Sequence, residues 1–307
     1  MCSLKAWPYL CIALLTASFF LAETSDAAAQ AAQQIEWCEG KNNASADQRI
    51  QGCTALIQSR AYGGKQLATI FRLRGYAYLY AKGSNYETDP AIQDYSEAIR
   101  LNPQDAAAFY GRGDAYKVKA QKSSGDDTRQ FVVLSIKDFS ENIRLNPKPT
   151  PLDYINRSNA YTLNGDYELA MGDLNEALRL DPSDKTEALV NRCRLYATLG
   201  RWPEALADCN DSLSRKDTPG QDPDREQDSI RARGLVFLKM GRYKDSVSDY
   251  DTALQYPKLN DSARSDALFG RGMAKLKNGD ASGNADIAAA KQLRPQVADG
   301  FARIGVK

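Results

Sequence analysis

Small and apolar residues recur at helical intervals through most of the chain. One run holds Ala170, Leu174 and Ala177 and ends at Pro182, and the same offsets recur from Ala91 onward. Side chains spaced in this way share one face of a helix, and proline stops the helix a few residues later. We therefore predict that each run is a helix whose apolar face packs against a neighbouring helix.

Short glycine-centred turns separate these helical runs into pairs. They are Asn164-Gly165-Asp166, Leu199-Gly200-Arg201, Met240-Gly241-Arg242 and Asn278-Gly279-Asp280. Glycine just past a helix end suits the left-handed conformation that closes a helix. The pattern indicates antiparallel helix pairs, each joined by a tight turn.

An arginine is followed by an aspartate at a nearly constant distance six times. The pairs are Arg74 and Asp94, Arg112 and Asp138, Arg157 and Asp173, Arg192 and Asp208, Arg233 and Asp249, and Arg271 and Asp286. A spacing that recurs every 35 to 45 residues marks an internal repeat. Each arginine precedes a small residue of a first helix, and each aspartate precedes an aromatic or apolar residue of a second helix. We predict a ladder of ion pairs at the edges of buried interfaces, within a repeat or between neighbours.

The residues after each arginine carry a second pattern. A small residue follows directly, and in five copies an aromatic residue stands four positions on: Tyr78, Tyr116, Tyr161, Tyr196 and Phe237. Together with the offsets of the second helix, this pattern resembles the tetratricopeptide repeat. The resemblance covers roughly residues 66–295. It implies an all-α, right-handed solenoid of stacked antiparallel helix pairs, with about six repeats and a capping helix at each end.

The resemblance divides the chain into a leader, a cap, six repeats and a last helix. We expect a signal peptide at 1–29, a Cys-bearing helical cap or half-repeat at 30–65, repeats at 66–104, 105–148, 149–183, 184–224, 225–259 and 260–295, and a capping helix at 296–307. The sixth repeat is degenerate and rich in alanine. The first two repeats carry longer loops between their helices, Lys82 to Pro90 and about Ala120 to Arg129.

The N-terminus has the layout of a secretory signal. Lys5 supplies a positive charge, residues 7–22 are strongly apolar, and Ala27-Ala28-Ala29 fits a small-residue cleavage site. The layout resembles that of exported tetratricopeptide proteins of the bacterial envelope, so we expect a periplasmic location. The alternative is a retained leader that anchors the protein in the membrane, facing the periplasm.

Four cysteines remain after the leader: Cys38, Cys53, Cys193 and Cys209. Four cysteines permit three pairings. Three repeats would separate the first two from the last two in space, so we predict the local pairs Cys38–Cys53 and Cys193–Cys209. An exported location favours disulfides; buried free thiols are the alternative.

The composition argues against most chemistry. The chain has no histidine, which excludes Ser-His-Asp and Cys-His nucleophilic sites and every metal site that needs histidine. No glycine-rich run has phosphate-loop spacing. Lys and Arg number 40 against 39 acidic residues, so no charge excess favours nucleic acid. We expect neither an enzyme nor a cofactor or metal, although a hydrolase using two carboxylates stays open.

The resemblance implies that the first helices form the inner wall of a groove. The outward positions on that wall that we expect to bind a partner are Arg72, Tyr76, Tyr80, Tyr110, Asp114, Lys117, Asn156, Asn159, Asn191, Arg194, Arg231, Lys239 and Phe269, with Ile155, Leu235, Met273 and Lys277 beside them. Tyrosine and arginine are frequent anchors of protein interfaces. The expected function is a protein-interaction scaffold for a peptide or helix with acidic and apolar side chains. The alternative is a self-assembling structural solenoid, and the oligomeric state is open.

Overall fold

The computed structural model describes residues 28–80, 87–123, 125–181, 185–214 and 223–306. Every regular element in these residues is a helix, which confirms the all-α prediction. The chain forms two compact units, an N-terminal unit, Met1–Pro147, and a C-terminal unit, Lys148–Lys307. The predicted signal peptide, 1–29, lies outside the described residues except for its last two positions.

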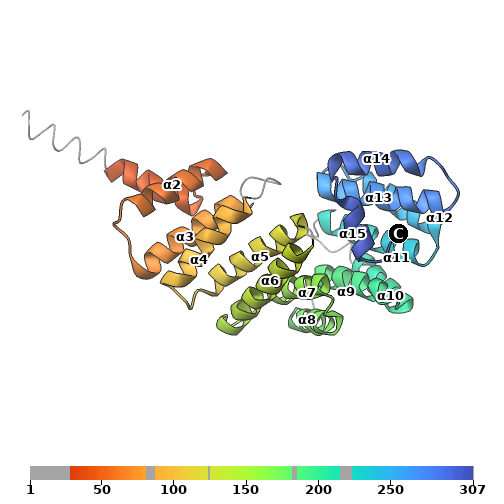
Figure 1. Ribbon diagram of the computed structural model, residues 1–307, viewed down its shortest axis with the longest axis horizontal. Coiled ribbons are helices and arrows are strands. Elements are labelled where there is room, and N and C mark those ends of the chain that lie inside the picture. The colour runs from red at the N-terminus through yellow and green to blue at the C-terminus, as the bar shows by residue number, and fades with distance from the viewer. Residues whose placement is uncertain (1–27, 81–86, 124, 182–184, 215–222, 307) are drawn as a thin grey trace, which may run out of the picture. The chain divides into compact units, whose positions relative to one another are not determined.

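The N-terminal unit stacks helix pairs, each packed on the next (Figure 1). A helix over residues 28–39 comes first, followed by α2 (Ala46–Gln58), α3 (Gly64–Tyr80), α4 (Thr88–Leu101), α5 (Ala106–Lys122) and α6 (Asp126–Leu145). Small buried residues at the helix crossings, such as Ala68, Ala91 and Ala115, let the backbones approach closely. Tyr95 and Phe139 fill the space between them.

The C-terminal unit also consists of stacked helix pairs. Its helices are α7 (Pro151–Asn164), α8 (Tyr167–Leu180), α9 (Thr186–Thr198), α10 (Trp202–Ser214), α11 (Pro223–Lys239), α12 (Tyr243–Leu254), α13 (Asp261–Lys277), α14 (Gly283–Leu293) and α15 (Val297–Arg303). The four predicted turn glycines all have positive φ, between 74° and 88°. They close helices as expected, and α15 packs on α13 and α14 (Figure 1).

Two boundaries differ from the sequence-based expectation. In the second repeat, α5 runs to Lys122 and α6 begins at Asp126, so most of the expected loop from Ala120 to Arg129 is helical. The long Arg112–Asp138 spacing therefore comes from longer helices. In the fifth repeat, α11 begins at Pro223, ahead of the expected boundary at 225, because proline is accepted in the first turn of a helix.

The ladder of arginine–aspartate pairs is confirmed. In all six repeats, Nε and Nη2 of the arginine donate to the two carboxylate oxygens of the aspartate at 2.6–2.9 Å. Every one of these aspartates is buried. Because a buried carboxylate is costly without a partner, the bidentate arginine satisfies it and fixes the two helices of a repeat in register.

The same arginines also reach the preceding helix pair. In five repeats, Nη1 donates to a side-chain oxygen there, at 2.7–3.2 Å: Thr54, Ser96, Asn175, Asn210 and Asp251. Four of these acceptors stand two positions after a ladder aspartate. Each such arginine therefore joins three helices rather than two.

Two tyrosines of second helices cross into the next repeat. Tyr95 reaches Gly111 of α5, and Tyr250 reaches Gly270 of α13. A Cβ atom on Gly111 would lie within 2.7 Å of Cε1, Cζ and Oη of Tyr95, and one on Gly270 within 2.6 Å of Cε2, Cζ and Oη of Tyr250. Glycine leaves the space that these rings occupy.

The cysteines pair locally. The Sγ atoms of Cys38 and Cys53 lie 2.01 Å apart, and those of Cys193 and Cys209 lie 2.04 Å apart. This is the expected pairing at bonding distance, and the oxidation of the cysteines in the cell stays a prediction. The first pair joins the helix over 28–39 to α2, so the cap is a full helix pair, not a half-repeat.

Candidate functional site

In the N-terminal unit, the expected wall residues form a tyrosine-rich surface on α3 and α5. Tyr76 is 44% exposed, and its ring lies 4.7 Å from that of Tyr80, centroid to centroid. The guanidinium carbon of Arg49 lies 5.0 Å from the Tyr76 ring centroid. An exposed aromatic ring with a cation on one side is suited to apolar or aromatic contact with a partner.

The polar residues of this surface bind one another. The Tyr80 hydroxyl donates to Asp114, which is also paired with Lys117. Burial, with the nearby Asp114 charge, raises the pKa of Tyr80, so the phenol stays protonated and donates. Asp114 is only 7% exposed, so its expected outward position is corrected: it orients Tyr80 and Lys117 from below the surface.

The remaining two positions of this surface are half-buried. Arg72 forms an ion pair with Asp105 at 3.3 Å. The Tyr110 ring packs edge-on against Phe139, with centroids 5.8 Å apart. Tyr110 is therefore partly a core residue. Tyr76 is the most exposed aromatic residue of the surface.

The asparagines of α7 and α9 do not form a continuous wall. The Asn156 amide donates to the Leu152 carbonyl at 3.1 Å, and the Asn191 amide donates to the Glu187 carbonyl at 3.0 Å. Asn156 is 7% exposed and its neighbour Ile155 is also buried, which corrects their expected outward positions; Asn159 is half-buried. The Asn156 and Asn191 amides therefore each donate to a carbonyl of their own helix.

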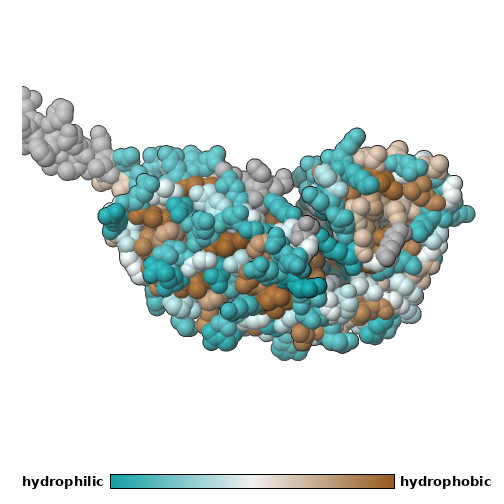
Figure 2. Space-filling view, viewed as in Figure 1, coloured by the Kyte–Doolittle hydropathy of each residue, from teal (hydrophilic) through white to brown (hydrophobic). Residues whose placement is uncertain are grey.

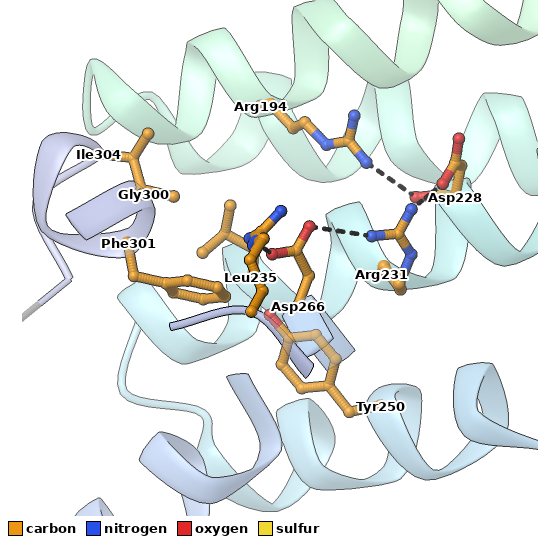
Figure 3. Close-up of a pocket in the computed structure, with 10 residues that line it drawn as sticks. Arg194, Asp228, Arg231, Leu235, Tyr250, Asp266, Gly300, Phe301 and Ile304 are labelled. Atoms are coloured by element: carbon orange, nitrogen blue, oxygen red, sulfur yellow. Dashed lines mark hydrogen bonds and ion pairs between the residues drawn. The ribbon is translucent and has the colours of Figure 1, made fainter. Parts of the chain in front are cut away.

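The C-terminal unit holds a pocket of about 310 Å³ that contains two of the expected wall residues, Arg194 and Arg231 (Figure 3). The lining residues lie on α9, α11, α12, α13 and α15, or directly after α14 and α15: Arg194, Asp228, Arg231, Leu235, Tyr250, Asp266, Arg294, Gly300, Phe301 and Ile304. In Figure 3, Arg194, Asp228 and Arg231 lie on one side, and Gly300, Phe301 and Ile304 lie on the other. The pocket therefore has a charged side and an apolar side.

Most charges in this pocket are matched. Arg231 donates to Gln227 Oε1 at 2.9 Å, pairs with Asp228, and lies 3.5 Å from Asp266. Arg294 binds Asp266 and donates to Ser262 Oγ at 2.8 Å. Arg194 has only the Asp228 carbonyl, 3.5 Å from its Nη2, as a hydrogen-bond acceptor within the described residues.

Helix α15 covers the last part of the expected wall. Lys239 Nζ donates to the Ile304 carbonyl at 2.6 Å, and the rings of Phe269 and Phe301 lie 4.8 Å apart. Phe269 is 6% exposed, so the chain's own C-terminal helix occupies the place expected for a partner. Burial also lowers the pKa of Lys239.

The surface view agrees with this packing. In Figure 2, apolar residues of the C-terminal unit gather where α13 to α15 lie, while the rest of that face is mixed or hydrophilic. Phe301, Val297 and Val306 are buried in this cluster. The sequence analysis expects 296–307 only as a capping helix; the apolar residues Val297 and Phe301, four positions apart, were the signal that this helix packs on the preceding repeat.

Other classes of site are not visible in the described residues. None of the helices described is both long and apolar enough to cross a membrane. Within the same residues, no cluster of three or more Cys, Asp or Glu side chains is arranged to hold a metal ion.

Comparisons with known proteins identify the repeats. Family models described as TPR repeat or tetratricopeptide repeat match residues 77–118, 154–184 and 231–298. No curated protein matches the sequence.

Solved structures share the fold. A tetratricopeptide repeat protein from Parabacteroides merdae superposes with a TM-score of 0.69 at 13% identity, covering 89% of this chain and 98% of that one. The pilus biogenesis factor PilW gives 0.52 at 15%, covering 77% and 94%. A chain of the APC/C hetero-tetramer Cut9-Hcn1 gives 0.60 at 12%, covering 84% of this chain. This chain matches about half, 48%, of that larger protein. Three family matches, the stacked helix pairs and these neighbours together show that the chain is a tetratricopeptide-repeat protein, a family whose members bind protein or peptide partners.

Proposed function

We propose that this chain is a non-enzymatic scaffold that holds a segment of a partner protein against its first helices. The observation that carries the proposal is the position of Arg194 and Arg231. Both were expected on the inner wall from the sequence, and both line one pocket of the C-terminal unit. The exposed ring of Tyr76 supplies a second contact surface in the N-terminal unit.

A binding role fits these residues better than catalysis. The sequence contains no histidine to serve as a base, and the carboxylates of the pocket are held by arginines. What the pocket offers instead is hydrogen-bond donors and apolar surface, which are the groups that recognise peptides.

Capture of a partner tests the proposal. Native envelope extract is crosslinked to the mature protein and to a variant carrying Tyr76→Ala and Arg194→Gln, and captured proteins are compared. The matched control is Leu169→Ala on α8, because Leu169 is 54% exposed but lies on a second helix. The scaffold predicts that a specific partner is lost from the double variant and kept by the control. Equal capture by all three proteins, with unchanged circular dichroism, would contradict it.

We also propose that the scaffold works in the bacterial periplasm. The supporting observation is the sequence layout of the leader, 1–29, together with two cysteine pairs at bonding distance. Osmotic-shock fractionation and the mass of the purified chain test this. Recovery of a chain shortened at about Ala29 in the periplasmic fraction is expected; a full-length chain in the membrane fraction would favour the anchored alternative.

A further inference from the structure

The charged side of the C-terminal pocket carries one positive charge that no carboxylate matches. Three guanidinium groups, Arg194, Arg231 and Arg294, line the pocket with two carboxylates, Asp228 and Asp266. Both carboxylates are engaged, Asp228 by Arg231 and Asp266 by Arg294 and Arg231. The excess charge therefore belongs to Arg194.

Arg194 is the least satisfied of these groups. An arginine has five N–H donors, and among the described residues this one uses a single donor, Nη2, in a long bond to a backbone carbonyl. Burial, only partly offset by nearby Asp228, lowers the pKa of the Arg194 guanidinium. Since arginine stays protonated in proteins, the lowered pKa means that its charge is held in unfavourable surroundings. An anion in the pocket would relieve this.

Tyr250 supplies a second unsatisfied donor in the same pocket. The residue is 2% exposed, and its hydroxyl makes no hydrogen bond with any part of the chain that the structure describes. The ring passes Gly270, and Figure 3 shows the hydroxyl directed toward the space between Asp266 and Phe301. Because this hydroxyl opens onto the pocket, it can donate a hydrogen bond to a ligand there.

The opposite side of the pocket is apolar. Leu235 of α11, Phe301 of α15 and Ile304 directly after α15 form it. A ligand that fills the pocket must therefore carry an apolar group beside its anion. One excess positive charge also suits a monoanion, because a phosphate dianion would meet the carboxylates of Asp228 and Asp266.

We propose that this pocket binds a carboxylate with an apolar group beside it. Arg194 donates to the carboxylate, the Tyr250 hydroxyl adds a further hydrogen bond, and the apolar group packs on Leu235, Phe301 and Ile304. The inference rests on the proposed scaffold function in taking the ligand to be part of a polypeptide. Two sources share this chemistry: the C-terminal carboxylate of an apolar residue, or the side chain of an acidic residue next to one.

Titration of the mature protein with small probes, followed by ligand-observed NMR, tests the pocket. N-acetyl-phenylalanine represents the terminal carboxylate, N-acetyl-glutamyl-phenylalaninamide the side chain, and N-acetyl-phenylalaninamide is the neutral control. We expect one of the two acids to bind about tenfold more tightly than the neutral amide, since hydrogen bonds to charged groups are strong. The acid that binds more tightly identifies whether the carboxylate is a chain terminus or a side chain. Inorganic phosphate should not compete with that acid for the pocket.

Three variants locate the effect. Arg194→Gln should abolish the preference for the acid. Arg201→Gln, which removes an exposed arginine in the turn between α9 and α10, should keep it. Tyr250→Phe should weaken the acid about two- to tenfold without lowering thermal stability, because its hydroxyl has no partner to lose. Equal binding of acid and amide, absence of binding by all probes, or an unchanged preference in Arg194→Gln would each overturn the pocket.

The two proposals fail in different ways. If the probes do not bind but Tyr76→Ala alone still removes a captured partner, the scaffold stands and the pocket is wrong. If the acid binds through Arg194 but no partner is captured from envelope extract, the pocket stands and the scaffold role is wrong.

Discussion

Replacement of Gly270 by alanine should destabilise the C-terminal unit, although alanine is the better helix former. A Cβ atom at this position would lie within 2.6 Å of three atoms of Tyr250, where relaxed contacts are about 3.5 Å or longer. Tyr250 is buried, so its ring cannot move aside easily. Overpacking of this size costs about 3 kcal/mol, at the upper end of its usual range, and alanine returns about 1 kcal/mol of helix propensity. The expected net loss is about 2 kcal/mol.

Urea and thermal unfolding followed by circular dichroism at the helical band measure this loss. A loss of about 2 kcal/mol corresponds to a fall of about 4–8 °C in Tm for a unit of this size. Gly172→Ala on α8 is the matched control, because Gly172 is exposed and nothing lies within 4 Å of its added Cβ. That variant should gain about 0.5–1 kcal/mol. If Gly270→Ala proves as stable as Gly172→Ala, the reasoning from close packing is refuted.

Three further predictions concern other contacts. The mature protein should take up no thiol reagent when it is denatured without reductant, and the double variant Cys193→Ala, Cys209→Ala should lose about 3 kcal/mol in urea unfolding. Burial alone would raise the pKa of Asp286, but hydrogen bonds from Arg271 and Lys275 outweigh it and hold the pKa below its ordinary value. The stabilising effect of this carboxylate is therefore complete above about pH 4 and disappears as the pH falls through its lowered pKa; Asp286→Asn should be less stable than wild type at pH 7, with a smaller difference near pH 3. Phe301→Ala should cost about 3 kcal/mol and expose the Phe269 ring, which thermal unfolding and dye binding would detect.

The repeat register was predictable because it depends on few, invariant contacts. A buried carboxylate needs a partner, and a small residue is needed where helices cross. Residues of the same kinds as Arg157, Ser158 and Asp173 therefore return in each repeat. These constraints act within one helix pair, so a short stretch of sequence is enough to predict them. The third hydrogen bond of the ladder arginines was missed, because Ser96 and Asn175 differ in type even though they stand at the same position.

The exposure of the expected wall residues was less predictable, because it depends on what else packs on the first helices. Arg194 and Arg231 line one pocket whose opposite side includes Phe301 of α15, and the sequence did not indicate that pocket. Phe269 and Lys239 were also expected on the wall, yet the segment that contains α15 covers them. A pattern along one helix cannot show that a segment 30 or more residues later returns to pack on it.

The cap was underestimated for a similar reason. Trp37 and Gly52 stand where the fourth repeat has Arg192 and Asp208, so the ladder signature is absent there. The helix pair is nevertheless complete, with its cysteines at the positions of Cys193 and Cys209. In the cap, close packing of its two helices takes the place of the arginine–aspartate pair. A Cβ atom on Gly52 would lie 2.6 Å from the Gln34 carbonyl oxygen.

The three-helix reach of the ladder arginines limits how this array can be cut and rejoined. Because Arg233 makes its third hydrogen bond to Asn210 of the preceding pair, a repeat excised at the end of its second helix loses that bond. Shortened or lengthened arrays should therefore be joined at the turn between the two helices of a repeat, so that every second helix travels with the first helix that follows it. Arg74 and Thr54 extend this rule to the cap, which is an integral module rather than a removable end piece.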